Sequence, residues 1–343
     1  MNEALHPLSL GEILDLTAQL YRSRFLVYFG IAVIPAGVVL VFAAGAFVFF
    51  AWAGSDVSNR ISSPLGSVLV WLFLSVVVLL ALPACLGSTA LGWAAMNHAA
   101  ARAFLGEPIS IRQSYAGVWK RGWHYVWLLL LLGFFVAVAP MGVALTALPA
   151  TVALQALARR AGMGAAATLL GVGIVLVMIA LAAYALWMLL RLSLAFPASV
   201  IERISAWSAL KRSSALSQGT RGRLSLLYLL GVALGQLLVL GFSLPLGVLM
   251  SLVPGAGNPR QAQMMGTILV FVFYGLWFVV QALTKPVYGI ALTLFYFDQR
   301  IRKEGFDIEW MMHQAGLTAP PSLQPAISPA AAVEASLPGE QQA

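Results

Sequence analysis

Long uncharged apolar stretches dominate the chain, and polar residues are confined to the short segments between them. Six stretches are long enough to cross the ~30 Å hydrocarbon core of a bilayer as helices, which takes about 20 apolar residues each. Their continuous apolar character lacks the two-residue alternation of barrel strands, so helices are predicted rather than a barrel. The predicted spans cover residues 25–53, 65–101, 123–148, 164–198, 224–253 and 264–297.

A short polar phrase precedes each pair of spans and follows the last pair. Each phrase ends in a residue that can cap a helix, namely Ser9, Ser110, Ser205 or Asp307. Ser9 with Glu12, and Ser110 with Gln113, have the spacing of capping boxes. Because the phrases recur about every 100 residues, the sequence predicts an all-α integral membrane protein with three hairpin repeats. A short amphipathic cytoplasmic helix is predicted before each hairpin, and a fourth after the last. These helices either lie in the membrane interface or are extensions that pack on the bundle.

This periodicity also divides the chain. Residues 1–24 are predicted to form an amphipathic cytoplasmic segment and residues 25–298 a six-span membrane domain. Residues 299–315 should hold the last amphipathic helix. Residues 316–343 are rich in Pro and Ala, and this composition predicts a disordered tail.

The distribution of charge orients the predicted spans. The chain carries a net charge of +8, but only four of its 20 Lys and Arg residues lie in the loops after odd-numbered spans. This asymmetry predicts a multi-pass protein of the cytoplasmic (inner) membrane with both termini in the cytoplasm. The expected partners of the basic face are anionic lipid headgroups, together with a possible protein partner, and not nucleic acid.

A few charged side chains inside or beside the spans are candidate functional residues. Lys285 follows 24 uncharged residues, so it either lines a polar path or extends to the membrane surface. Arg191 and the pair Asn97-His98 either share a polar layer with it or anchor the spans near the surface. Glu202 and Glu304, each three residues before a cap, either pair with the basic cluster that contains Arg212 or remain solvated.

The exit of the sixth span is the densest group of candidates. Asp298 and Arg302 stand four residues apart in the favourable order for a helical ion pair, and Arg300 adds charge at the predicted headgroup level. Gly305 suits the left-handed position that ends a helix, and Asp307 is predicted to cap the next one.

Residues 292–310, LTLFYFDQRIRKEGFDIEW, resemble the C-terminal signature of the glycerophosphoryl diester phosphodiesterase membrane-domain family. Residues 7–25 and 208–223 are similar to other parts of that family, so the resemblance brackets residues 5–312. It implies a multi-span prokaryotic membrane protein, sometimes fused to a catalytic barrel. No soluble stretch here could hold a barrel of ~250 residues, so the hydrolase activity is not carried over.

The polar residues form no recognisable catalytic or cofactor motif. The four His residues lack metal-ligand spacing, and no phosphate-binding glycine loop or nucleophile elbow occurs. We therefore expect no cofactor and no enzyme activity. The expected function is a non-catalytic membrane module that organises lipid or docks a partner through its cytoplasmic helices. The alternatives are a transporter or exporter of an amphiphilic or lipid-derived solute and, after that, a lipid-modifying membrane enzyme.

Overall fold

The protein is described by a computed structural model that covers residues 6–61, 64–251 and 259–314. The tail at residues 316–343 lies outside the described residues. Within them the chain is almost entirely helical and has no β-strand. The helices are α1 (Leu10–Ser23), α2 (Phe25–Ile61), α3 (Pro64–Phe104), α4 (Ile111–Trp119), α5 (Gly122–Gly133), the π-helical η1 (Phe134–Val138), α6 (Ala139–Arg160), α7 (Gly164–Leu192), α8 (Ala195–Ile201), α9 (Ala206–Leu216), α10 (Arg221–Ser251), α11 (Pro259–Glu304) and α12 (Phe306–Gln314).

Six helical segments are long and apolar enough to cross a membrane, which confirms that part of the prediction. They cover residues 25–46, 65–104, 122–160, 164–201, 221–248 and 268–304. Neighbours in sequence pack together in three pairs: α2 with α3, α6 with α7, and α10 with α11. Most of their large outward side chains are aliphatic or aromatic, as a lipid-facing surface requires.

Two of the six segments are interrupted, and a proline explains each interruption. Pro197 has no N–H and its ring excludes a helical carbonyl at Ser193, so α7 ends there and α8 starts at Ala195. The Leu194 N–H instead donates to Ser213 Oγ at 3.1 Å. Pro140 likewise cannot donate to Val136, and the π turn η1 lies immediately before it. The sequence predicted both segments as continuous spans.

The short helices begin at the predicted caps in three of four cases. Ser9 and Glu12 form a complete capping box. Ser110 accepts the Gln113 N–H at 3.2 Å, but the return bond from the Gln113 side chain is absent from the described residues. Ser205 caps α9 by accepting the Ser208 N–H at 3.2 Å. These serines fix where α1, α4 and α9 start, as the local sequence indicated.

Each of these short helices packs on long ones. α1 lies along α11, where Tyr21 Oη donates to the Leu283 carbonyl at 3.1 Å. α4 crosses α2 and α3, and Tyr115 Oη donates to the Ile31 carbonyl at 2.9 Å. α9 packs on α8, and Ser213 Oγ donates to the Arg191 carbonyl at 2.9 Å. The short helices are therefore integral parts of the bundle.

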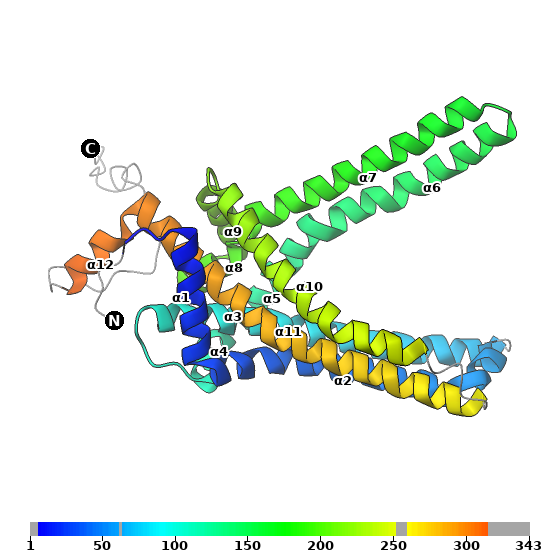
Figure 1. Cartoon of the computed structure of the whole chain (residues 1–343), viewed down its shortest axis with the longest axis horizontal. Helices are drawn as coiled ribbons and strands as arrows, with labels where there is room; N and C mark the ends of the chain where they lie inside the picture. Colours follow the sequence, from blue (N-terminus) through cyan, green and yellow to red (C-terminus); the bar gives the residue numbers. More distant parts are fainter. Residues whose placement is uncertain (1–5, 62–63, 252–258, 315–343) are drawn as a thin grey trace, which may run out of the picture.

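The core of the molecule lies at one end of the long helices. Its main contributions are residues 90–101 of α3, residues 190–201 of α7 and α8, and residues 290–301 of α11. We call this end, with α1, α4, α9 and α12, the charged end. From it, α2, α3, α10 and α11 run together, whereas the α6–α7 pair diverges from them (Figure 1). The molecule is therefore tightly packed at the charged end, and away from it the α6–α7 pair makes few contacts with α2, α3, α10 and α11.

Candidate functional site: the charged end

Asp298 joins the N-terminal segment to the last two long helices. Its side chain is fully buried near the end of α11, and its carboxylate accepts the Leu8 N–H at 2.9 Å. Arg302 donates to it at 2.8 Å and Arg223 of α10 at 3.2 Å. Both arginines also donate at 2.8 Å to the Leu8 carbonyl, which fixes the chain before α1 on both sides. The predicted Asp298–Arg302 pair is confirmed, and Arg223 and Leu8 are partners that spacing alone did not reveal.

A second ionic cluster connects α8, α9 and α11. Glu202 is buried at the end of α8, where it accepts from Arg212 Nε at 2.9 Å and from the hydroxyl of Tyr296. Arg212 also pairs with Glu304 at 2.5 Å, and Arg300 donates to Glu304 at 3.1 Å. Glu202 and Glu304 therefore pair with the basic cluster, as one of the two sequence interpretations held.

Neighbouring carboxylates favour the charged form of Arg212. Burial on its own lowers the pKa of Arg212, but the carboxylates of Glu304 and Glu202 more than compensate and raise that pKa above its ordinary value. A charged pair that is largely removed from water stabilises a fold only when its geometry is good and its remaining polar groups are bonded. Glu202 meets this condition because its carboxylate also accepts a hydrogen bond from the Tyr296 hydroxyl. The cluster is suited to clamping three helices in one arrangement.

The junction of α11 and α12 differs in one respect from the prediction. Gly305 has a φ of +67°, in the left-handed region, which confirms its expected role at the helix end. However, α12 begins at Phe306, and the Gly305 carbonyl accepts its first bond, from the Ile308 N–H at 3.0 Å. Asp307 therefore lies in the first turn, and the prediction that it is the cap is wrong. Its charge there suits the positive end of the helix dipole.

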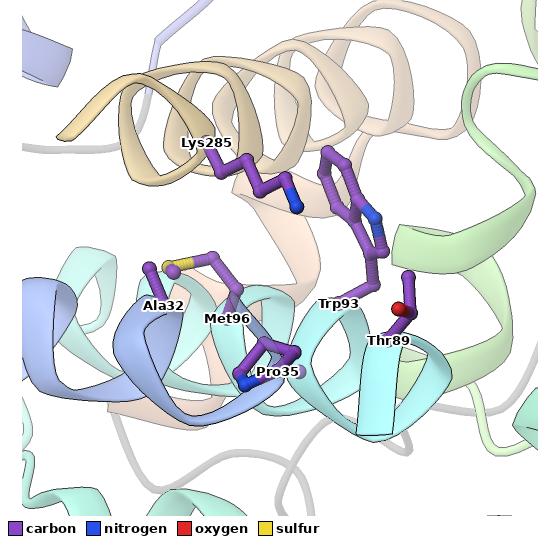
Figure 2. A pocket seen from close by; sticks show the side chains of 7 residues that line it. Ala32, Pro35, Thr89, Trp93, Met96 and Lys285 are labelled. Carbon is purple, nitrogen blue, oxygen red and sulfur yellow. The ribbon is translucent and has the colours of Figure 1, made fainter. Parts of the chain in front are cut away.

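Lys285 lies away from the ionic clusters, midway along α11. Its side chain points toward Trp93 and Met96 of α3 across a cavity that Pro35 of α2 also lines (Figure 2). The cavity measures about 20 Å³, room for about one water molecule. About ten residues, or ~15 Å of helix, separate Pro35 from the start of α2. Among the described residues Lys285 forms no salt bridge.

The other polar side chains of the spans do not join Lys285. Asn97 accepts from Thr293 Oγ1 at 2.8 Å, in a buried contact between α3 and α11. Arg191, at the end of α7, donates from Nε to Ser214 Oγ of α9 at 2.9 Å. A single polar layer through Lys285, Arg191 and Asn97 is therefore not formed. Arg191 and Asn97 each fix one helix to another near the charged end.

At the charged end, arginine side chains pair with the buried carboxylates. The buried carboxylates of Asp298 and Glu202 are occupied by arginines. The part of the chain that the structure describes contains no group of three His, Cys, Asp or Glu side chains that could hold a metal ion.

Comparison with known proteins gives no matching family model, no matching curated protein and no matching solved structure. The resemblance to the glycerophosphoryl diester phosphodiesterase membrane-domain family therefore stays a prediction.

Proposed function

We propose that this chain is a non-catalytic, multi-pass module of a prokaryotic cytoplasmic membrane that organises anionic lipid at its charged end. In this proposal the charged end faces the cytoplasm, together with both termini. The six long helices cross the bilayer as three hairpins of equal orientation. Docking of a protein partner on the same face is compatible with this function.

Two observations support the three-hairpin arrangement. A short helix precedes each packed pair, in the order α1 with α2–α3, α4 with α5–α7, and α9 with α10–α11. The three main core segments, 90–101, 190–201 and 290–301, lie 100 residues apart in sequence. A two-span repeat starts and ends on the same side, so its copies share one orientation.

The observation that carries the lipid function is a rim of exposed tryptophans beside cations. Trp119, Trp123 and Trp207 are 69%, 81% and 53% exposed on α4, α5 and α9. Lys120 and Arg121 lie between the first two in sequence. Tryptophan favours the headgroup level of a bilayer, and each nearby Lys or Arg contributes ~1 kcal/mol of attraction to anionic lipid. This combination fits a surface held against an anionic leaflet.

The interior favours a module over a transporter. A solute path needs a polar-lined passage at mid-membrane depth. The cavity at Lys285, at the depth expected for such a path, has room for only about one water molecule. A larger hollow, of about 450 Å³, lies between α6 and α7 and has an apolar lining. The divergence of the α6–α7 pair favours transport of an amphiphilic solute, since few contacts hold this pair against the other long helices (Figure 1).

Thiol labelling in intact cells tests the orientation. In a Cys85→Ala background, Arg60→Cys, Arg159→Cys and Arg260→Cys should react with an impermeant reagent. Arg112→Cys and Lys211→Cys, both at exposed positions, should react only after lysis, because positive loops remain inside. Labelling of either set from the wrong side refutes the proposed topology.

Lipid analysis tests the function itself. Protein extracted in polymer-bounded native discs should be enriched in anionic phospholipid relative to the whole membrane. The double variant Lys120→Gln/Arg121→Gln should lose part of this enrichment. The matched double variant Arg159→Gln/Arg160→Gln, at the opposite end of α6, should keep it. Equal lipid composition in discs and membrane argues against the proposal.

A further inference from the structure

A hollow of about 400 Å³ at the charged end combines an apolar wall with unpaired cations. It lies between η1, α7 and α9. Phe135, Met188 and Trp207 contribute apolar side chains to its lining, and Arg191 and Lys211 contribute two cations. Its size falls within the ~300–1,000 Å³ typical of ligand pockets. A molecule that filled it would need an apolar part and an anionic part.

The positive charge at this hollow has no protein counter-charge. In the described part of the chain, Arg191, Lys211 and Arg221 form no salt bridge, whereas Arg212 and Arg223 at the charged end do. Arg191 donates only from Nε, to Ser214 Oγ, which leaves its two terminal nitrogens for a ligand. Lys211 is exposed to solvent. A phosphate oxygen could therefore approach both cations without displacing a carboxylate.

Trp187 concentrates this charge. The guanidinium carbon of Arg191 lies 5.1 Å from its ring centroid, and that of Arg221 lies 5.5 Å from the same centroid. Both guanidinium groups therefore interact with the same indole ring. Arg221 Nε is buried and has no hydrogen-bond partner among the described residues. Trp187 thus links Arg191, which lines the hollow, to Arg221, which lies outside its lining and has an unused donor.

The apolar wall depends on the π turn. η1 carries Phe135, whose ring centroid lies 6.4 Å from that of Trp207 on α9. A π turn shifts the direction of the following side chains relative to an α-helix, and such turns are frequent at functional sites. Met188 extends the wall along α7 toward the outward apolar residues of that helix. The hollow is thus continuous with the surface that lipid would cover.

We propose that this hollow binds one anionic phospholipid. Arg191 and Lys211 hold its phosphate, and its acyl chains lie over Phe135, Met188 and Trp207. This inference rests on the proposed lipid function, since it names the site where one lipid is held. A soluble anion would leave the apolar wall in water, and a neutral lipid would leave the cations unpaired.

Native mass spectrometry of the delipidated full-length protein tests the assignment, with phosphatidylglycerol and phosphatidylcholine as probes. The wild type should retain phosphatidylglycerol in preference. Arg191→Gln/Lys211→Gln should weaken phosphatidylglycerol binding by about tenfold or more, because two contacts to one phosphate are lost. Arg159→Gln/Arg160→Gln removes the same charge from the other end of α6–α7 and should bind as the wild type does.

A second variant guards against misfolding. Lys211→Gln changes an exposed side chain that carries no fold contact at the charged end, and it should weaken binding by about threefold. Glycerol 3-phosphate should compete poorly, because it lacks acyl chains; effective competition overturns the lipid assignment. Unchanged binding in the Arg191/Lys211 double variant overturns the site alone. Absence of any preference for phosphatidylglycerol in the wild type overturns the proposed lipid function as well.

Discussion

Replacement of Asp298 by Asn tests the tie between the N-terminal segment and the last two long helices. The carboxylate is fully buried and accepts from Leu8, Arg302, Arg223 and Gln299 at 2.8–3.2 Å. Asn keeps the size but removes the charge and turns one acceptor oxygen into a donor, which then faces other donors. The two arginines would be left without their anion.

The size of the effect follows from this burial. Breaking a buried pair costs ~3–5 kcal/mol. Arg223 and Arg302 are 31% and 38% exposed and can regain some hydration, so the lower value, about 3 kcal/mol, applies. Glu107→Gln is the matched control, because the Arg102–Glu107 pair is 30% and 50% exposed. Exposed pairs contribute ~0–1 kcal/mol, so this control should barely change stability.

Two measurements check this prediction in mild detergent. The melting temperature of Asp298→Asn should fall by about 5 °C or more. Hydrogen exchange of the peptide that contains Leu8 should become faster, since its amide loses its acceptor. If the two variants Asp298→Asn and Glu107→Gln have the same melting temperature and the Leu8 amide stays protected from exchange, the Asp298 carboxylate does not hold the N-terminal segment in place.

Four further predictions concern α2, α3, α11 and α12. Gly305→Val should lower the melting temperature more than Gly305→Ala, because a β-branched residue tolerates a φ of +67° poorly; equal shifts argue against this explanation. Asp307→Asn and Asp307→Ala should each cost only ~0.3–1 kcal/mol, as the loss of a dipole contact rather than a cap, and a larger loss in Asp307→Ala alone would restore the capping role. Lys285→Met should leave abundance normal and the melting temperature equal or higher, because a partly buried amine without a counter-charge is destabilising. A marked fall in the melting temperature would instead indicate that Lys285 has a stabilising ionic partner. Gly92→Leu should impair folding, since even a Cβ at residue 92 would lie 2.7 Å from Pro35 Cγ; normal yield after solubilisation contradicts this close approach.

The features predicted correctly from the sequence are those with local causes. Ser9, Ser110 and Ser205 cap helices through bonds to residues three positions ahead, so the sequence around each contains the information. Helix type and length follow from continuous apolar stretches. Gly305 could be assigned because few residues adopt positive φ. The prediction for Asp307 was wrong because the backbone carbonyl of Gly305 accepts the first hydrogen bond of α12. Every residue has such a carbonyl, so the sequence alone does not indicate this role.

The features that could not be predicted depend on contacts between distant residues. Tyr296 and Glu202 are 94 positions apart, and Arg223 reaches the Leu8 carbonyl across 215 positions. Such pairs become visible only when the packing of the helices is known. Pro197 and Pro140 could have indicated the interruptions at α8 and η1. However, proline is common in membrane helices and need not interrupt them: α2 is continuous although Pro35 lies inside it.

Because the packed core is confined to the charged end, the two ends of the long helices are under different constraints. A change of length in the outer parts of α6 and α7 would alter few contacts with the other helices. An insertion within residues 290–301 would instead rotate every buried side chain after it by 100° per added residue. Descendants of this chain could therefore adapt to thicker or thinner bilayers by changing the outer turns, while the spacing of the inner segments stays fixed.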